Sequence, residues 1–383
     1  MRIKNIKVYF LKKKKYESAY PRPTFYKQGF VFIKLISEDN HEGFGEPSPY
    51  ITDPVNLIKM IEKTYLKYFQ NKKLNTSYVA RLKKNCQNSL LNSLLPAFDQ
   101  AIFEIFSKEK KKNVSKILRN KSLSNLDFYA SGGMFFEGQN YQKLLNEAIK
   151  SKRDGFKGYK YRPLMPANNL SHQQRMKNPP PIDIKSIELF SSKLRLKLGP
   201  RFKIMIDLGC RCENIRETRY LFDIFKEYDY YFIEEPFKRN LKSYELLNKI
   251  KTNINLAGGE HINNIQLFHK WNKKKYFNFF QPDTNLMLFS EINSMIDKIG
   301  YEKIILHNWC NKINFLSNIN FAFSLKNKIL IEKNIIPNPY DNFFNIGKQE
   351  VKYGKIDFRE TIGYGVTIKN SKTKNLEIYE KKI

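Results

Sequence analysis

Apolar and polar residues alternate with period two in the first part of the chain. Segments 3–12 (IKNIKVYFLK) and 29–39 (GFVFIKLISED) show this alternation, and 39–48 contains a turn that leads into a short third strand. Apolar residues then recur at intervals of three and four over 95–112, which is the spacing of an amphipathic helix. We therefore predict an α+β module with an antiparallel sheet over residues 1–125.

From about residue 126 the pattern changes to short apolar runs separated by amphipathic segments. One such segment, 214–228, opens with Asn214 followed three residues later by Glu217, which is a helix N-terminal signature. Eight strands alternating with helices favour a closed parallel barrel over an open sheet. The predicted strands lie within 126–132, 158–163, 202–207, 230–235, 254–260, 276–283, 303–308 and 328–333.

Six polar residues stand at the ends of these strands, at intervals of 27, 26, 23, 24 and 25 residues. One strand–helix unit fits each interval, so each residue takes the same place in its own unit, on the rim where such barrels carry active sites. Five carboxylates and one imidazole gathered there need a cation or a catalytic proton equilibrium to compensate them. The six residues are Asp207, Glu234, Glu260, Asp283, His307 and Glu332.

Three of these carboxylates come from successive strands and form an all-oxygen set suited to Mg²⁺. They are Asp207, Glu234 and Glu260. Zn²⁺ is less favoured, because no His or Cys falls in phase with them. Neighbouring strand residues face opposite sides, so we expect Glu234 to point into the barrel mouth and Glu235 to turn into the wall and pair with a basic group.

Composition sets limits on the class of protein. The 383 residues suit two or three domains, and 41% hydrophobic and 14% aromatic residues exclude global disorder. A net charge of +31 raises the question of nucleic-acid binding. Lysine is frequent all along the chain, however, and no nucleic-acid-binding motif accompanies the short lysine runs, so we favour a solvated surface.

The location follows from what the sequence lacks. No apolar run is long enough for a membrane span, and the first 20 residues lack the pattern of a secretory signal. The four cysteines match neither zinc-finger nor redox spacing. We predict a reduced, cytoplasmic protein without a membrane partner, and a homo-oligomer.

Motifs along nearly the whole chain resemble those of the enolase superfamily, specifically its mandelate racemase subgroup. They are GYKYRP, IMID, FIEEP, LAGGEH, QPD and LHNW on successive barrel strands, and IGYGVTI near the end. The resemblance implies a (β/α)7β barrel over 126–345, with the α+β capping domain at 1–125 and a C-terminal segment, 346–383, that returns to it. It also implies an essential Mg²⁺ and abstraction of the proton α to a carboxylate, with the metal stabilising the enediolate.

The resemblance gives roles to single residues. Asp207, Glu234 and Glu260 would be metal ligands, and His307 with Asp283 would be a His–Asp dyad. Glu332 would hydrogen-bond the substrate carboxylate, and Lys160 with Arg162 would stand for the Lys-x-Lys of the subgroup.

Two departures from the subgroup pattern bear on mechanism. Arg162 replaces the second Lys, the usual base on that face, and LGCRC follows Asp207 where Asp-x-Asn is usual. In addition, the interval from Lys160 to Asp207 is about twenty residues too long for one unit, so 163–183 is predicted to form a loop over the mouth. We expect this loop and the capping-domain segment 14–28 to select substrate, and we regard His172 as a surface or lid residue.

The predicted function is an Mg²⁺-dependent lyase, an acid-sugar dehydratase acting on a small carboxylate. A racemase or epimerase of the same subgroup is the alternative, and it needs a competent base on each face of the substrate carbon. A basic binding protein on an inactive barrel is a third possibility, which the intact set of candidate metal ligands disfavours.

Overall fold

The structure is a computed structural model that describes residues 1–13, 29–119, 123–133, 140–164, 181–250, 253–346, 351–352, 354–356, 361–369 and 376–383. The segments predicted to cover the mouth, 14–28 and most of 163–183 including His172, lie outside the described residues.

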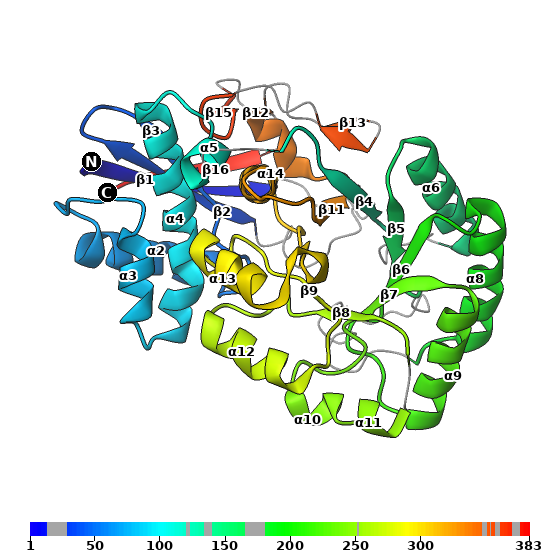
Figure 1. Ribbon diagram of the computed structural model, residues 1–383. Helices are drawn as coiled ribbons and strands as arrows, with labels where there is room; N and C mark the ends of the chain where they lie inside the picture. Colours follow the sequence, from blue (N-terminus) through cyan, green and yellow to red (C-terminus); the bar gives the residue numbers. More distant parts are fainter. Residues whose placement is uncertain are drawn as a thin grey trace.

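Eight parallel strands form one sheet in the order β10-β11-β4-β5-β6-β7-β8-β9. A parallel bridge between Phe280 and Ile304 connects the two ends of this sheet, so it closes into a barrel (Figure 1). Each predicted barrel strand is present, and the predicted fold class is confirmed. The strands are β4 (Asp127–Ser131), β5 (Gly158–Tyr161), β6 (Lys203–Asp207), β7 (Tyr230–Glu234), β8 (Leu256–Gly258), β9 (Phe279–Phe280), β10 (Ile305–Leu306) and β11 (Leu330–Asn334).

Helices surround the barrel (Figure 1). Asparagine begins several of them: the Asn214 side chain accepts hydrogen bonds from the backbone N–H groups of Arg216 and Glu217, which confirms the predicted start of α9. The elements of this layer are α6 (Tyr141–Arg153), α8 (Ile184–Leu198), α9 (Ile215–Glu227), α10 (Leu241–Tyr244), α11 (Leu247–Ile250), α12 (Ile265–Lys274), α13 (Phe289–Ile299), the 3₁₀ turn η1 (Tyr301–Lys303) and α14 (Lys312–Phe323).

The capping domain is built on an antiparallel sheet of order β16-β1-β2-β3. Strand β16 comes from the end of the chain and pairs with β1, so the two termini lie together (Figure 1). The elements of this domain are β1 (Ile3–Lys13), β2 (Phe30–Ser37), β3 (Glu42–Gly45), α2 (Pro54–Tyr68), α3 (Tyr78–Lys84), α4 (Ser89–Glu109), α5 (Val114–Leu118) and β16 (Leu376–Lys382).

Short elements connect the last barrel strand to β16. Two of them, β12 and β15, pair antiparallel, as do β13 and β14. They are η2 (Pro339–Phe343), β12 (Phe344–Ile346), β13 (Val351–Lys352), β14 (Lys355–Ile356) and β15 (Val366–Ile368).

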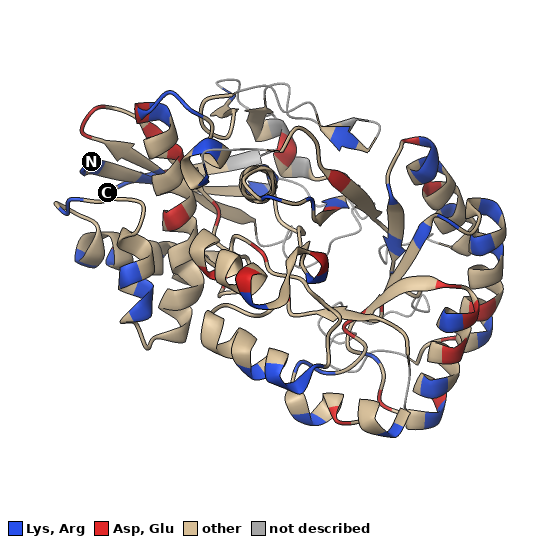
Figure 2. Ribbon diagram, viewed as in Figure 1, with Lys and Arg blue, Asp and Glu red and all other residues tan. Residues whose placement is uncertain are grey.

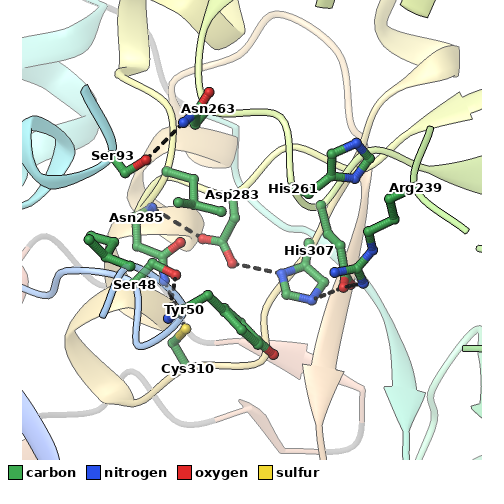
Figure 3. Close-up of a pocket in the computed structure, with 13 residues that line it drawn as sticks. Ser48, Tyr50, Ser93, Arg239, His261, Asn263, Asp283, Asn285, His307 and Cys310 are labelled. Carbon is green, nitrogen blue, oxygen red and sulfur yellow. Dashed lines mark hydrogen bonds and ion pairs between the residues drawn. The ribbon is translucent and has the colours of Figure 1, made fainter. Parts of the chain in front are cut away.

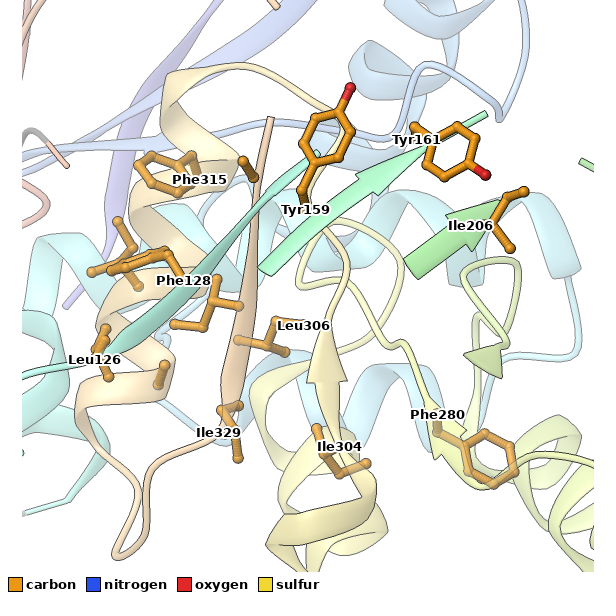
Figure 4. Packing of buried hydrophobic residues seen from close by; sticks show 14 of the residues in the cluster. Leu126, Phe128, Tyr159, Tyr161, Ile206, Phe280, Ile304, Leu306, Phe315 and Ile329 are labelled. Atoms are coloured by element: carbon orange, nitrogen blue, oxygen red, sulfur yellow. The ribbon is translucent and has the colours of Figure 1, made fainter. Parts of the chain in front are cut away.

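Hydrophobic residues fill the space between strands and helices and also the barrel interior. The outward-facing side chain of Phe128 packs against Phe315 of α14, and Leu306 belongs to the same cluster (Figure 4). A separate cluster closes the inside of the barrel, so the fold has a packed floor below its rim. Its buried members are Tyr129, Met205, Phe232, Ala257 and Ile305.

The charged residues of the surface are distributed as the sequence suggests. Lys and Arg lie on helices around the barrel with Asp and Glu among them (Figure 2), as expected of a solvated surface. In the described part of the chain, no helix has the length and apolar character needed to cross a membrane. The four cysteines are free.

Candidate active site

The polar rim follows from the period of the strands. Asp207, Glu234 and His307 each lie two residues beyond a member of the interior hydrophobic cluster, namely Met205, Phe232 and Ile305. Side chains two positions apart on a strand face the same side. The site is therefore the next layer above the apolar floor.

Lys160 of β5 lies at the centre of this layer, with 3% of its side chain exposed. Its Nζ is 2.6 Å from Glu234 Oε2 and 2.7 Å from Glu332 Oε1. Gln281 donates a further hydrogen bond to Glu234 Oε2 at 2.6 Å. Burial raises the pKa of Glu234 to about 8, with Lys160 opposing this increase and the neighbouring carboxylates adding to it.

Arg162 lies immediately after β5 and binds Asp207 through two guanidinium nitrogens, with Nε donating to Oδ2 at 2.6 Å. The guanidinium carbon stands 5.4 Å from the centroid of the Trp309 ring, within range of a cation–π contact. Trp309 in turn donates from Nε1 to Glu332 Oε1 at 2.9 Å and to Ser131 Oγ at 3.2 Å. Arg162 is thus held by a carboxylate and an aromatic ring.

His307 and Asp283 form the predicted pair, with Nδ1 2.8 Å from Asp283 Oδ2 (Figure 3). The other ring nitrogen, Nε2, lies 3.0 Å from Glu260 Oε2. Although burial lowers the pKa of His307, Glu260 and the bond to Asp283 outweigh that effect and raise it well above its usual value. Nδ1 thus faces Asp283, and Nε2 faces Glu260 and the pocket.

Glu235 turns into the barrel wall and pairs with basic groups, as the sequence predicted. Its φ of +43° takes the chain out of β7 in a left-handed conformation. Its carboxylate then accepts the Gly259 N–H at 2.9 Å and lies 3.2 Å from Arg239 Nε and 3.6 Å from His261 Nδ1. Glu235 is therefore a buried wall residue that fixes the turn after β8.

A pocket of about 200 Å³ opens beside the His307–Asp283 pair (Figure 3). It lies between the barrel rim and the capping domain, which contributes Ser48 and Tyr50. Residues lining it include Tyr50, Arg239, Glu260, His261, Asp283 and His307.

The structure adds residues that the sequence did not single out. Arg239 contacts Glu260 as well as Glu235, and together with His307 it outweighs the effect of burial and holds the pKa of Glu260 well below its usual value. Gln281 belongs to the QPD motif, and Trp309 belongs to LHNW. The motifs could have pointed to these two, whereas a single Arg four residues after Glu235 gives no comparable signal.

The predicted rim positions differ in detail from the observed ones. Strand β8 ends at Gly258, so Glu260 lies in the following turn, and β9 ends three residues before Asp283. Gly259, with φ of +96°, starts that turn. His307 directly follows β10, and Glu332 lies within β11. The spacing of the repeats was thus predicted correctly, although β8 and β9 end earlier in the structure than the sequence suggested.

Fold and site together define a capped parallel barrel whose rim carries an Asp-supported imidazole, a buried lysine and a partly exposed arginine. Residues 143–372 match the model of the enolase C-terminal domain-like family. The chain belongs to this family, and thus to the mandelate racemase/muconate lactonizing group of the enolase superfamily, as the sequence motifs predicted.

Known proteins extend this likeness over almost the whole chain. Arabinonate dehydratase from Saccharolobus solfataricus is 22% identical over 355 residues, which are 89% of this chain and 88% of that protein. The 3,6-anhydro-D-galactonate cycloisomerase from Zobellia galactanivorans is similar in structure, with a TM-score of 0.75, 19% identity and coverage of 96% and 97%. A mandelate racemase/muconate lactonizing enzyme from Jannaschia sp. CCS1 gives a TM-score of 0.78, 14% identity and coverage of 96% and 95%. At these identities the structural likeness establishes the fold.

Members of this superfamily generally use a divalent metal, typically Mg²⁺. Within the described residues, no three His, Cys, Asp or Glu side chains converge closely enough to hold one ion. Each predicted ligand is instead neutralised by a protein cation, which is Arg162 at Asp207, Lys160 at Glu234 and Arg239 at Glu260. The chemistry of the donor set nevertheless fits Mg²⁺, because it consists of three carboxylates on adjacent strand units, of which Asp207 and Glu234 are buried. Their assignment as metal ligands stays a prediction.

Proposed function

We propose that this protein is an Mg²⁺-dependent acid-sugar dehydratase, a lyase that removes water from a small polyhydroxy carboxylate. Membership of the superfamily supports enzymatic abstraction of a proton next to a carboxylate. The arabinonate dehydratase relative supports an acid sugar as substrate. Asp207, Glu234 and Glu260 would hold the metal, which when bound would supply positive charge to the oxygens of the enediolate.

The observation that supports this proposal most is the asymmetry of the two faces of the site. One side presents His307 Nε2, with Asp283 orienting the ring through Nδ1. The other side presents Lys160 and Arg162, both tied to buried carboxylates. A guanidinium is poorly suited to take a proton at neutral pH.

The proposed reaction proceeds with His307 as acid or base. The C–H bond α to the carboxylate breaks, the C–O bond to the β-hydroxyl breaks, and the proton and hydroxide leave as water. The resulting enol becomes a 2-keto-3-deoxy acid. Lys160 and Arg162 supply positive charge where negative charge develops on the substrate carboxylate. By the family resemblance Glu332 would hydrogen-bond that carboxylate, for which it must carry a proton, because two ionised carboxylates have no donor between them.

Racemisation or epimerisation by the same fold is the second candidate. It requires a base on each face, and the pairing of Lys160 with Glu234 and Glu332 raises the pKa of its ammonium well above the usual value in spite of burial. A protonated lysine and an arginine on that face favour one-sided chemistry. This supports dehydration over inversion.

The test is a screen of aldonic and aldaric acids with Mg²⁺, with arabinonate included, in which 2-keto-3-deoxy acid is measured. We expect at least one acid to be dehydrated by the wild-type protein and none by His307→Asn. Formation of an epimer without loss of water would refute the dehydratase assignment. The same assay after removal of divalent metal should show no turnover.

A further inference from the structure

A buried hydrogen-bond network joins the capping domain to the His307–Asp283 pair. It begins at Glu46, which follows β3 and is fully buried. Its Oε1 accepts the Asn311 N–H at 2.8 Å and its Oε2 accepts the Asn314 N–H at 2.9 Å. These N–H groups belong to the start of α14, where the Asn311 side chain makes no capping bond. Glu46 therefore caps a barrel helix from the other domain.

Asn314 is the next link, and both ends of its amide are occupied. Its Nδ2 donates to Asp283 Oδ1 at 2.7 Å, while its Oδ1 accepts from Gln100 Nε2 at 3.2 Å and from Thr284 Oγ1 at 3.1 Å. A rotated amide would present oxygen to the Asp283 carboxylate and NH₂ to two donors. The donors on the far side thus fix the orientation that serves Asp283.

The orientation of the Gln100 amide determines which groups of this network donate hydrogen bonds and which accept them. Gln100 lies on α4 and is fully buried. Its Oε1 accepts the Glu46 N–H at 2.9 Å, so its Nε2 is directed at the barrel, where it also donates to the Thr284 carbonyl at 2.9 Å. A backbone N–H can only donate a hydrogen bond, so the Gln100 amide has only one orientation in which both of its ends are satisfied.

The network ends at the carboxylate that orients the imidazole. Asp283 Oδ1 accepts from Asn314 Nδ2, from Asn318 Nδ2 at 3.2 Å and from the Asn285 N–H at 3.3 Å. The bond from Asn314 is the shortest of the three. The other oxygen of Asp283, Oδ2, then remains directed at His307 Nδ1 at 2.8 Å.

From this geometry we infer that Glu46 and Gln100 of the capping domain are positioning residues for the His307–Asp283 pair and act on it through Asn314. The role in turnover rests on the proposed function, whereas the role in holding the imidazole does not. The capping domain would then help to assemble the acid–base group of the barrel besides covering the pocket.

Two variants and one control test this inference. Glu46→Gln offers one oxygen where two N–H groups need acceptors, and Gln100→Met keeps a similar volume while removing both polar ends. The control is Asn320→Ala, because Asn320 is also buried on α14 but donates to the Leu316 carbonyl, outside the network.

The first measurement needs no substrate. The low-field proton signal of the His307 Nδ1–H is identified by its loss in His307→Asn, and its exchange with water is then compared. We expect exchange to be faster by about tenfold or more in Glu46→Gln and Gln100→Met, and unchanged in Asn320→Ala. Thermal unfolding of all three variants measures the general loss of stability.

The second measurement is turnover of whichever acid sugar the wild type dehydrates. We expect kcat to fall by about 10- to 100-fold in both network variants, with KM changed much less. Unchanged exchange in both variants, or an equal change in Asn320→Ala, would overturn the inference. If Glu46→Gln does not fold, Gln100→Met decides, since it leaves the Glu46 carboxylate in place. If the wild type dehydrates none of the acids, the proposed function fails while the exchange comparison still decides the positioning role.

Discussion

Asp283→Asn should invert the proton arrangement of His307 with little change in shape. The three N–H donors at Asp283 Oδ1 come from Asn314, Asn318 and Asn285. An asparagine at 283 must direct its single oxygen there, since the opposite orientation would set NH₂ against three donors. Each buried donor left unpaired costs about 1–3 kcal/mol, and only one bond, to His307, favours that opposite orientation.

The amide nitrogen therefore faces His307 Nδ1, which must then accept a hydrogen bond. The neutral imidazole would carry its proton on Nε2, the atom that faces the pocket, and could not take a proton from substrate. Inverting the tautomer of a catalytic histidine lowers kcat by about 10⁴-fold, which is about 5.4 kcal/mol in the activation barrier. We expect a loss of that order for Asp283→Asn.

Two measurements check this prediction. The ¹⁵N shifts of labelled His307 report which ring nitrogen carries the proton, and dehydration kinetics report the rate. Asp297→Asn, an exposed change on α13, serves as the control and should leave both unchanged. An Asp283→Asn protein with kcat within tenfold of wild type, or with the proton still on Nδ1, would refute the reasoning.

Three further predictions concern buried charge. Glu234→Gln should abolish Mg²⁺ affinity and turnover together, whereas Glu235→Gln should act on stability, with a loss of about 3–5 kcal/mol in urea unfolding; the reverse pattern would contradict the assignment of the two residues. Lys160→Met leaves Glu234 and Glu332 without their ammonium partner, so the free energy of unfolding should fall by about 3–5 kcal/mol, and a stable variant would argue against the pairing. Burial raises the pKa of Asp99 to about 7, so the unfolded chain ionises this group near pH 4 while the folded protein keeps its proton. Wild-type stability should therefore fall as pH rises from about 4 to 7, by up to about 1.4 kcal/mol per pH unit from this group, and Asp99→Asn, measured by urea unfolding at several pH values, should remove that part of the slope.

Repeating units made the barrel predictable from the sequence. The apolar strand cores and the regular spacing of polar residues identified all eight strands, and Asn214 identified the start of α9. Period two also distinguished Glu234 from Glu235, because the two carboxylates need opposite faces. These features are local, or they repeat at a constant interval, so a single sequence contains them.

Contacts between distant segments were not predictable in the same way. Glu46 caps a helix whose N-cap residue, Asn311, lies 265 residues later, and no local pattern marks a carboxylate for such a role. The pairing of Arg162 with Asp207 and of Arg239 with Glu260 also depends on side-chain reach across the rim. The spacing predicted which residues share the rim, but not which ones form ion pairs there.

The contact between Arg162 and Trp309 has a practical consequence. The chain contains two tryptophans, and the other one, Trp271, is buried 5.2 Å from Phe277 in a stacked pair on the outer side of the barrel. Trp309 contacts Arg162 and Glu332 of the rim directly, whereas Trp271 reaches the pocket only through His261, whose ring centroid lies 5.5 Å away. Indole emission responds to nearby charge, so the fluorescence of Trp309 reports the arrival of a carboxylate or a cation at the rim. Trp271 contributes a second emission, which Trp271→Phe would remove, and ligands can be ranked by titration without any added dye.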